Sequence, residues 1–304
     1  MSADQKSRMR RISLSGYDGK ISVCYWAGPE GAPILHWAHA NGFNGQTYAP
    51  LLEKLSERFH VYAADARGHG KTSLRANPEN HFGWDVYRDD LVSLLYQLRG
   101  RHDNAPLMLG GHSMGGCASI MAASKEPGLA QGMVLADPVI IPLRLKLMMK
   151  VLGVLNFKVG GGAILAKMSR KRRAVWPDAK TIIAAYTGRG AFTTWHKAFL
   201  VSYVKGGTLK VDDGLRLACA PDWEAANFEH QSHNSIKPVR KLATPFSLLV
   251  AAQGSTTRGI DVFKKNPNCH CVKVIPESTH FLPMETPDII IAEIYALADK
   301  LGLN

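Results

Sequence analysis

Short apolar runs recur along the chain and alternate with longer stretches whose apolar residues repeat at the spacing of one helix face. The apolar runs predict eight β-strands, at residues 11–14, 21–26, 33–38, 61–64, 107–109, 133–136, 246–251 and 271–275. Tyr17-Asp18-Gly19 predicts a hairpin between the first two strands. Helices are predicted at residues 47–57, 84–98, 116–125 and 287–301. The pattern therefore predicts an α/β fold, built on an eight-stranded and mostly parallel sheet with both faces covered.

The alternation is interrupted once, between residue 138 and about residue 237, where helical periodicity continues without a strong strand signal. Residues 143–159 form an amphipathic stretch, and further helices are predicted at residues 181–186, 192–204 and 223–233. We therefore predict two domains. Residues 1–137 and 238–304 form the core domain, and residues 138–237 form a helical cap inserted after the sixth strand.

The composition is that of an ordinary globular protein, with 304 residues, 46% hydrophobic and 20% charged. The polar N-terminus leads into no apolar run, so no signal peptide is expected. Every long apolar run is broken by Lys, Arg or Gly before it could span a bilayer, which predicts no transmembrane helix. The five cysteines lack the spacing of a disulfide framework or a zinc site, and Cys269-His270-Cys271 has no second cluster. We expect a reduced, cytoplasmic protein without a metal.

The formal net charge of +12 is concentrated in two clusters. The clusters are Arg8, Arg10 and Arg11 at the start, and Lys167, Arg170, Lys171, Arg172 and Arg173 in the middle of the chain. No nucleic-acid-binding module or interleaved aromatic platform accompanies them, so a nucleic-acid partner is not expected. We interpret the clusters as solvated basic faces. Peripheral contact of the basic cap with an anionic membrane, or orientation of an acidic substrate, are the alternatives.

The strongest chemical signal is Gly110-Gly111-His112-Ser113-Met114-Gly115-Gly116, which lies between a predicted strand and a helical stretch. Gly-x-Ser-x-Gly in this context is the pattern of a nucleophile elbow. Small neighbours allow a sharp strand-to-helix turn that strains the central residue and lifts its side chain above the sheet. We therefore predict that Ser113 is the nucleophile. The backbone N–H of Met114, at the start of the helix, is predicted to donate to an oxyanion.

With this motif in place, the chain resembles the α/β-hydrolase superfamily over nearly its whole length except the cap. His39-Ala40-Asn41-Gly42-Phe43, after the third strand, is similar to the oxyanion loop of that family. The resemblance implies Asn41 as the second backbone donor of the oxyanion hole, with Phe43 as the alternative. The segment from Asp65 to Gly70 resembles the turn after the fourth strand of the family, which implies structural roles for Asp65, Arg67 and His69.

A third segment, Pro276 to Glu285, follows the last strand and resembles the catalytic-histidine loop of the family. A serine hydroxyl needs an adjacent base at neutral pH, and imidazole titrates near pH 7. Of the twelve histidines, His280 alone lies C-terminal to Ser113, after a strand and before the final helix. We therefore predict that His280 is the base. His112 occupies the variable position of the elbow, and His39 is expected to support the oxyanion loop.

The third member of the catalytic triad is an acid. Most of the superfamily carries it after the seventh strand, but here residues 254–260 contain no carboxylate. Asp137 follows the sixth strand, and a minority of the family, including some haloalkane dehalogenases and zearalenone lactonases, has its acid there. The ends of strands six and seven are neighbours, and Pro138 fixes the chain beyond the carboxylate. We therefore assign the acid to Asp137, with Asp261 or an unusual acid as the alternatives.

Serine at the elbow argues against epoxide hydrolases and haloalkane dehalogenases, which resemble this fold but use Asp there, so an acyl substrate is expected. Apolar residues of the predicted cap favour a hydrophobic acyl or alkyl group. We predict a carboxylic-ester hydrolase that works through an acyl-enzyme, needs no cofactor and acts on a small-molecule hydrophobic ester or lactone. The alternatives are a lactonase, a thioesterase or carbon–carbon-bond hydrolase, and a receptor that keeps the fold for ligand binding without catalysis.

Overall fold

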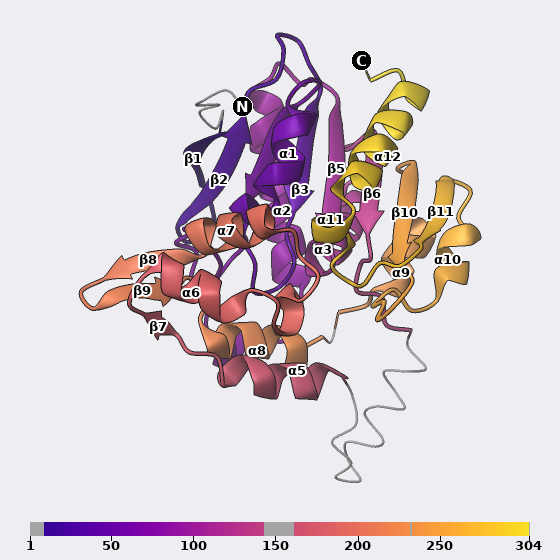
Figure 1. The fold of residues 1–304 in the computed structure, drawn as a ribbon. Coiled ribbons are helices and arrows are strands. Elements are labelled where there is room, and N and C mark those ends of the chain that lie inside the picture. The colour runs from indigo at the N-terminus through magenta and orange to yellow at the C-terminus, as the bar shows by residue number, and fades with distance from the viewer. Residues whose placement is uncertain (1–8, 143–160, 232, 304) are drawn as a thin grey trace.

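The structure is a computed structural model that describes residues 9–142, 161–231 and 233–303 (Figure 1). Arg8 of the N-terminal basic cluster and the whole of the amphipathic stretch predicted at residues 143–159 lie outside the described residues.

An eight-stranded sheet forms the centre of the molecule, with the strand order β1-β2-β4-β3-β5-β6-β10-β11. The strands are β1 (Met9–Ser15), β2 (Lys20–Trp26), β3 (Ile34–Ala38), β4 (His60–Ala64), β5 (Leu107–His112), β6 (Gly132–Ala136), β10 (Phe246–Ala251) and β11 (Cys269–Ile275). The first two strands form the predicted hairpin, in which Ser15 pairs with Lys20, and β2 runs antiparallel to β4. All other pairs in the sheet are parallel. The predicted fold class is confirmed.

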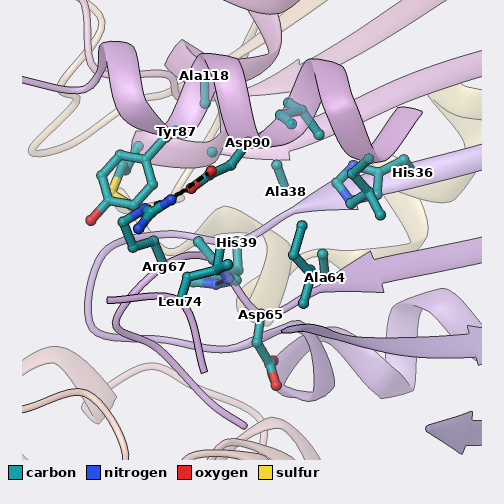
Figure 2. Close-up of a pocket in the computed structure, with 16 residues that line it drawn as sticks. His36, Ala38, His39, Ala64, Asp65, Arg67, Leu74, Tyr87, Asp90 and Ala118 are labelled. Atoms are coloured by element: carbon teal, nitrogen blue, oxygen red, sulfur yellow. Dashed lines mark hydrogen bonds and ion pairs between the residues drawn. The ribbon is translucent and has the colours of Figure 1, made fainter. Parts of the chain in front are cut away.

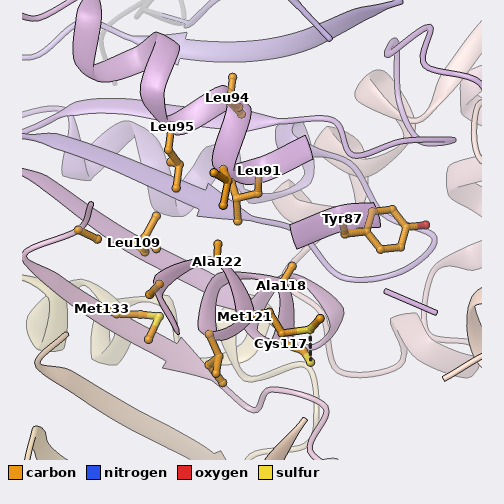
Figure 3. Close-up of a cluster of buried hydrophobic side chains, with 14 of the residues drawn as sticks. Tyr87, Leu91, Leu94, Leu95, Leu109, Cys117, Ala118, Met121, Ala122 and Met133 are labelled. Carbon is orange, nitrogen blue, oxygen red and sulfur yellow. Dashed lines mark hydrogen bonds between the residues drawn. The ribbon is translucent and has the colours of Figure 1, made fainter. Parts of the chain in front are cut away.

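Helices cover both faces of the sheet (Figure 1). Helices α1 (Ala49–Leu55) and α12 (Pro287–Lys300) pack together on one face, while α2 (Asp85–Gly100) and α3 (Met114–Lys125) pack together on the other. Leucines at positions 91, 94, 95 and 98 of α2 follow the spacing of one helix face and are buried. Figure 3 shows Leu91, Leu94 and Leu95 in one cluster that also contains Ala118 and Ala122 of α3 and Leu109 and Met133 of the sheet.

The chain leaves the sheet after β6 and returns to it at β10. The described elements in between are α5 (Gly161–Arg170), β7 (Val175–Trp176), α6 (Ala179–Tyr186), α7 (Lys197–Gly206), β8 (Thr208–Val211), β9 (Gly214–Leu217), α8 (Pro221–Glu229) and α9 (Ile236–Lys241). At the point of departure Ile140 forms a bridge to Thr257, with hydrogen bonds from Ile140 N to Thr256 O and from Arg258 N to Ile140 O. The division into core and cap domains stays a prediction.

Besides its helices, the inserted segment contains three short strands that the sequence did not predict. Strands β7, β9 and β8 form a small antiparallel sheet. They are two to four residues long, and most of their side chains are only partly buried, so they give no strong apolar run. The helix predicted at residues 192–204 begins only at Lys197, after a short 3-10 turn at Gly190–Phe192.

The basic cluster of the inserted segment has two kinds of member. Lys167, Lys171 and Arg173 are exposed, as predicted, whereas Arg172 is largely buried beside Glu224. Three apolar residues of the inserted segment, Ile164, Leu165 and Met168, are exposed on α5. Within the described residues, no helix is both long and apolar enough to cross a membrane.

Helix α3 approaches the loop after β3 so closely that Gly115 leaves no room for a side chain. A Cβ atom there would lie 2.3 Å from the Ala38 carbonyl oxygen and 2.6 Å from that of His39. We expect Gly115→Ala to lower the free energy of unfolding by about 1–3 kcal/mol, because two backbones must separate. Gly100→Ala at the end of α2 is the control, since a Cβ atom at that position would have no neighbouring atom within 4 Å.

Urea denaturation of both variants measures the difference. Gly100→Ala should be neutral or slightly stabilising, because alanine is the better helix former. Equal effects of the two substitutions would contradict the close approach.

Candidate active site

The predicted elbow lies between β5 and α3. Ser113 has φ 57° and ψ −117°, and the helix begins at the next residue, Met114. This conformation is strained for a residue with a side chain, and it persists only where the surroundings fix it. A Cβ atom on Gly111 would lie 2.8 Å from the backbone of Gly115 and Gly116, so the glycine is what lets strand and helix meet. Ser113 is thereby presented at the helix N-terminus.

His280 lies in the loop after β11, and its Nε2 is 2.9 Å from Ser113 Oγ. The loop is held by Glu285, whose carboxylate accepts hydrogen bonds from the Thr279 amide and from the Thr279 hydroxyl. A proton on the serine hydroxyl is therefore within hydrogen-bonding reach of the imidazole, as general-base chemistry requires.

Asp137 completes the arrangement from the end of β6. Its Oδ2 lies 2.6 Å from His280 Nδ1, and the residue is fully buried with φ 42°. Asp261, the alternative acid, lies exposed on α10 (Ile260–Lys264) and has no hydrogen bond to His280 among the described residues. The structure thus brings together Ser113, His280 and Asp137, which is the preferred combination from the sequence.

The loop after β3 lies against the elbow, and most of its amides are engaged. Ala40 N–H donates to the Tyr48 hydroxyl, Gly42 N–H to His69 Nε2 and Phe43 N–H to the Ala40 carbonyl. The described part of the chain offers no acceptor for the Asn41 amide. Met114 N–H, in the first turn of α3, has no partner within the helix either. The two amides predicted to hold an oxyanion are therefore uncommitted, whereas that of Phe43 is occupied.

Comparison with known proteins agrees with the fold. A family model described as serine aminopeptidase, S33, matches residues 33–181. The solved structure of E-2-(acetamidomethylene)succinate hydrolase has a TM-score of 0.74 at 22% identity, over 96% of this chain and 99% of that chain. A peroxisomal α/β-hydrolase from Saccharomyces cerevisiae has a TM-score of 0.75 at 17% identity, over 98% and 89% of the two chains. This chain has the fold of the α/β-hydrolase superfamily.

Two curated relatives of this α/β-hydrolase are named as a hydrolase and a lipase. The 2-(acetamidomethylene)succinate hydrolase of Mesorhizobium japonicum is 26% identical over 272 residues, which cover 88% of each chain. Monoglyceride lipase of Rattus norvegicus is 31% identical over 131 residues, which cover 42% of this chain and 43% of the lipase.

Sequence reasoning missed the groups that hold the acid of this α/β-hydrolase. Ser255 Oγ donates to Asp137 Oδ1 at 2.5 Å, and the Thr256 amide donates to Oδ2 at 2.9 Å. Both belong to the loop after β10, where most of the superfamily carries the acid itself. The signal was the run Ser255-Thr256-Thr257 at that position, since hydroxyl groups there supply donors to a carboxylate from the neighbouring strand.

These contacts set the charge state of the acid. Burial by itself raises the pKa of the Asp137 carboxyl, but hydrogen bonds from His280, Ser255 and the Thr256 amide outweigh burial and lower that pKa below its ordinary value. Asp137 therefore stays ionised at neutral pH, where it can accept from the imidazole.

Two neutral histidines fix the oxyanion loop to the turn after β4. His39 Nδ1–H donates to the Ala40 carbonyl, and its Nε2 accepts from the Ala66 amide. His69 donates from Nδ1 to the Arg67 carbonyl and accepts the Gly42 amide. Burial lowers the pKa of both rings, that of His69 to about 3, so neither is charged near neutral pH. The structural roles expected of His39 and His69 agree with these contacts.

Aromatic side chains surround Phe43 beside the site. Its ring centroid lies 5.1 Å from Trp195, 5.7 Å from Tyr203 and 6.3 Å from Phe281. Trp195 and Tyr203 come from the inserted segment and are buried. That segment therefore contributes an apolar wall next to the oxyanion loop.

A buried ion pair lies behind this wall. The Glu224 carboxylate lies close to Gly42, where a Cβ would be 2.8 Å from its Cδ. Arg172 pairs with Glu224 and donates to the Tyr203 hydroxyl at 2.6 Å. A carboxylate beside the oxyanion loop would oppose a developing negative charge, and the guanidinium group compensates it.

The lowered pKa of Asp137 predicts a pH-dependent contribution to stability. A carboxyl whose pKa is lower in the folded chain stabilises the fold above its unfolded pKa of about 3.9, and this contribution is lost as the pH falls through the folded value. We expect the difference in unfolding free energy between the native chain and Asp137→Asn to shrink below about pH 4, because protonated Asp resembles Asn.

Urea denaturation between pH 3 and pH 7 measures this difference, and Asp261→Asn on the exposed α10 is the control. A difference that stays constant across the whole range would show that the native carboxyl has no lowered pKa.

Proposed function

We propose that this α/β-hydrolase cleaves a carboxylic ester of a hydrophobic substrate through an acyl-enzyme on Ser113. The observation that carries the proposal is the continuous hydrogen-bond chain from Ser113 Oγ through His280 to Asp137, at 2.9 Å and 2.6 Å. A nucleophile, a base and a group that orients the base are the parts that acyl transfer needs.

In the proposed reaction, Ser113 Oγ attacks the acyl carbonyl while His280 Nε2 takes the hydroxyl proton. The amides of Met114 and Asn41 donate to the oxyanion that forms. When this intermediate collapses, the imidazolium returns its proton to the leaving alcohol oxygen, and the acyl group stays on the serine. A water molecule then attacks the acyl-enzyme, with His280 again as base, and releases the acid. Asp137 keeps the imidazole in the tautomer with hydrogen on Nδ1 throughout.

Two observations support a hydrophobic ester as the substrate. The aromatic wall of Phe43, Trp195 and Tyr203 favours an apolar acyl or alkyl group over a hydrophilic one. The named activities of relatives include a monoglyceride lipase and, among solved structures at 20% identity and a TM-score of 0.65, a thermophilic esterase from Thermogutta terrifontis. A thioester stays an alternative, because a thioesterase domain from the curacin pathway has a TM-score of 0.72 at 15% identity.

Ser113→Ala tests the nucleophile. A fluorophosphonate probe should label the native chain at Ser113 and leave the variant unlabelled, and ester hydrolysis should fall by roughly 10⁴-fold or more. Asp137→Asn should lower kcat by roughly 10³–10⁴-fold, because the imidazole loses its orienting partner. Asp261→Asn is the matched control and should stay within about twofold. Full labelling of Ser113→Ala would place the nucleophile elsewhere.

A substrate panel separates the ester hydrolase from its alternatives. We expect kcat/KM for p-nitrophenyl esters to rise with acyl length from acetate to octanoate, by roughly tenfold for each two methylene groups that bind in an apolar environment. Lactones and acyl thioesters of matched length should react more slowly. Faster turnover of lactones would favour a lactonase, and saturable binding without turnover would favour a receptor.

A further inference from the structure

A chain of hydrogen bonds runs beneath the active site and joins its two catalytic loops. His112, the last residue of β5, is fully buried. Its Nε2 lies 2.7 Å from the carbonyl oxygen of His280, and its Nδ1 lies 2.8 Å from the Tyr48 hydroxyl. The same hydroxyl accepts the Ala40 amide at 3.1 Å. The chain therefore extends from the amide that precedes Asn41 to the backbone of the base.

The direction of each bond follows from its two ends. An amide can only donate, so the Tyr48 oxygen is the acceptor of Ala40 N–H. A carbonyl oxygen can only accept, so the proton of His112 is on Nε2. The Tyr48 hydroxyl proton then has His112 Nδ1 as its acceptor. Every member is satisfied by one tautomer of a neutral imidazole, and burial, reinforced by the nearby His280, lowers the pKa of His112 to about 3.

We propose that His112 and Tyr48 are positioning residues, which hold the base loop and the oxyanion loop at a fixed separation on either side of Ser113. The inference rests on the proposed function, since it assigns the effect to the base and to the oxyanion donor. His112 precedes the nucleophile directly, so it ties the elbow itself to the carbonyl of His280. Tyr48 extends this tie to the loop that carries Asn41. The His112 ring lies 4.8 Å from the His280 ring, but the hydrogen bonds of His112 and Tyr48 go to the His280 carbonyl and the Ala40 amide and not to the Ser113 hydroxyl or the His280 imidazole.

Burial alone does not require such a chain. His36 on β3 is equally buried, and neither of its ring nitrogens has a hydrogen-bond partner in the described structure. It lines a cavity of about 50 Å³ on the α2–α3 side of the sheet (Figure 2), whose lining includes neither Ser113 nor His280. His36 therefore only fills space in the core, whereas His112 connects two loops by hydrogen bonds.

A second matched pair exists among the tyrosines. Tyr62 on β4 is buried like Tyr48, and its hydroxyl also lies within hydrogen-bond distance of a histidine ring, 2.7 Å from His102 Nε2. Tyr48→Phe and Tyr62→Phe each remove one oxygen atom and one hydroxyl–histidine bond, and Tyr48→Phe also removes the acceptor of the Ala40 amide. Only the first variant interrupts the chain between the loops.

The test compares these two variants with an ester substrate. We expect Tyr48→Phe to lower kcat by roughly tenfold with KM within about twofold, because misplaced groups cost rate in the transition state. The rate of fluorophosphonate labelling should fall in parallel. Tyr62→Phe should leave kcat within about twofold, although it too should lower the urea midpoint. Equal kcat values for the two variants, or an effect confined to KM, would overturn the proposal.

His112→Phe breaks the chain at its centre, with His36→Phe as the control and His112→Gln as the variant that keeps a donor for the His280 carbonyl. We expect a roughly hundredfold loss of kcat for His112→Phe and partial recovery for His112→Gln. Adding Tyr48→Phe to His112→Phe should change kcat by less than about twofold, because the two residues act as one unit. Additive losses would show that they act separately.

Native protein that is not labelled at Ser113 would refute the proposed function itself. Labelling at Ser113 together with unchanged kcat in Tyr48→Phe and His112→Phe would refute the positioning role alone.

Discussion

The strained backbone of Ser113 is the constraint on which the rest of the site depends. A residue held at φ 57° and ψ −117° costs on the order of 1–3 kcal/mol, which the surrounding packing must offset. Gly111 and Gly115 make that packing possible, because a side chain on either would collide with backbone atoms. The turn aims the hydroxyl at His280 and leaves the first amide of α3 without an internal partner. A relaxed backbone at this position would misplace both the Ser113 hydroxyl and this amide.

Hydrogen bonds of neutral imidazoles connect the backbone segments around this turn. His39, His69 and His112 are buried and uncharged. The first two connect backbone groups of different loops, and His112 connects the His280 carbonyl to the Tyr48 hydroxyl. The buried charge of Asp137 is compensated by hydrogen-bond donors of one short loop. Such contacts change little with pH near neutrality. The charges of the groups that surround the His280 imidazole therefore stay constant while it exchanges protons.

The sequence predicted the strands of the large sheet, because short apolar runs are local signals. It also predicted the three residues of the proposed triad, because each follows a predicted strand. It failed for β7, β8 and β9, whose pairing is decided by tertiary contacts. The sequence predicts a solvated Arg172, because no local pattern indicates that Glu224 and Tyr203 bury its side chain. Tyr48 and His112 are 64 positions apart, and only folding makes them partners.

The acid occupies the last position before the inserted segment, and this placement has a consequence for how the family can diversify. Three residues later, Ile140 is anchored to Thr256, Thr257 and Arg258 of the core. Beyond that anchor the chain can change length or sequence without pulling on the carboxylate of Asp137. Substrate preference and proton handling can therefore evolve independently, even though they are encoded by adjacent stretches of the same polypeptide.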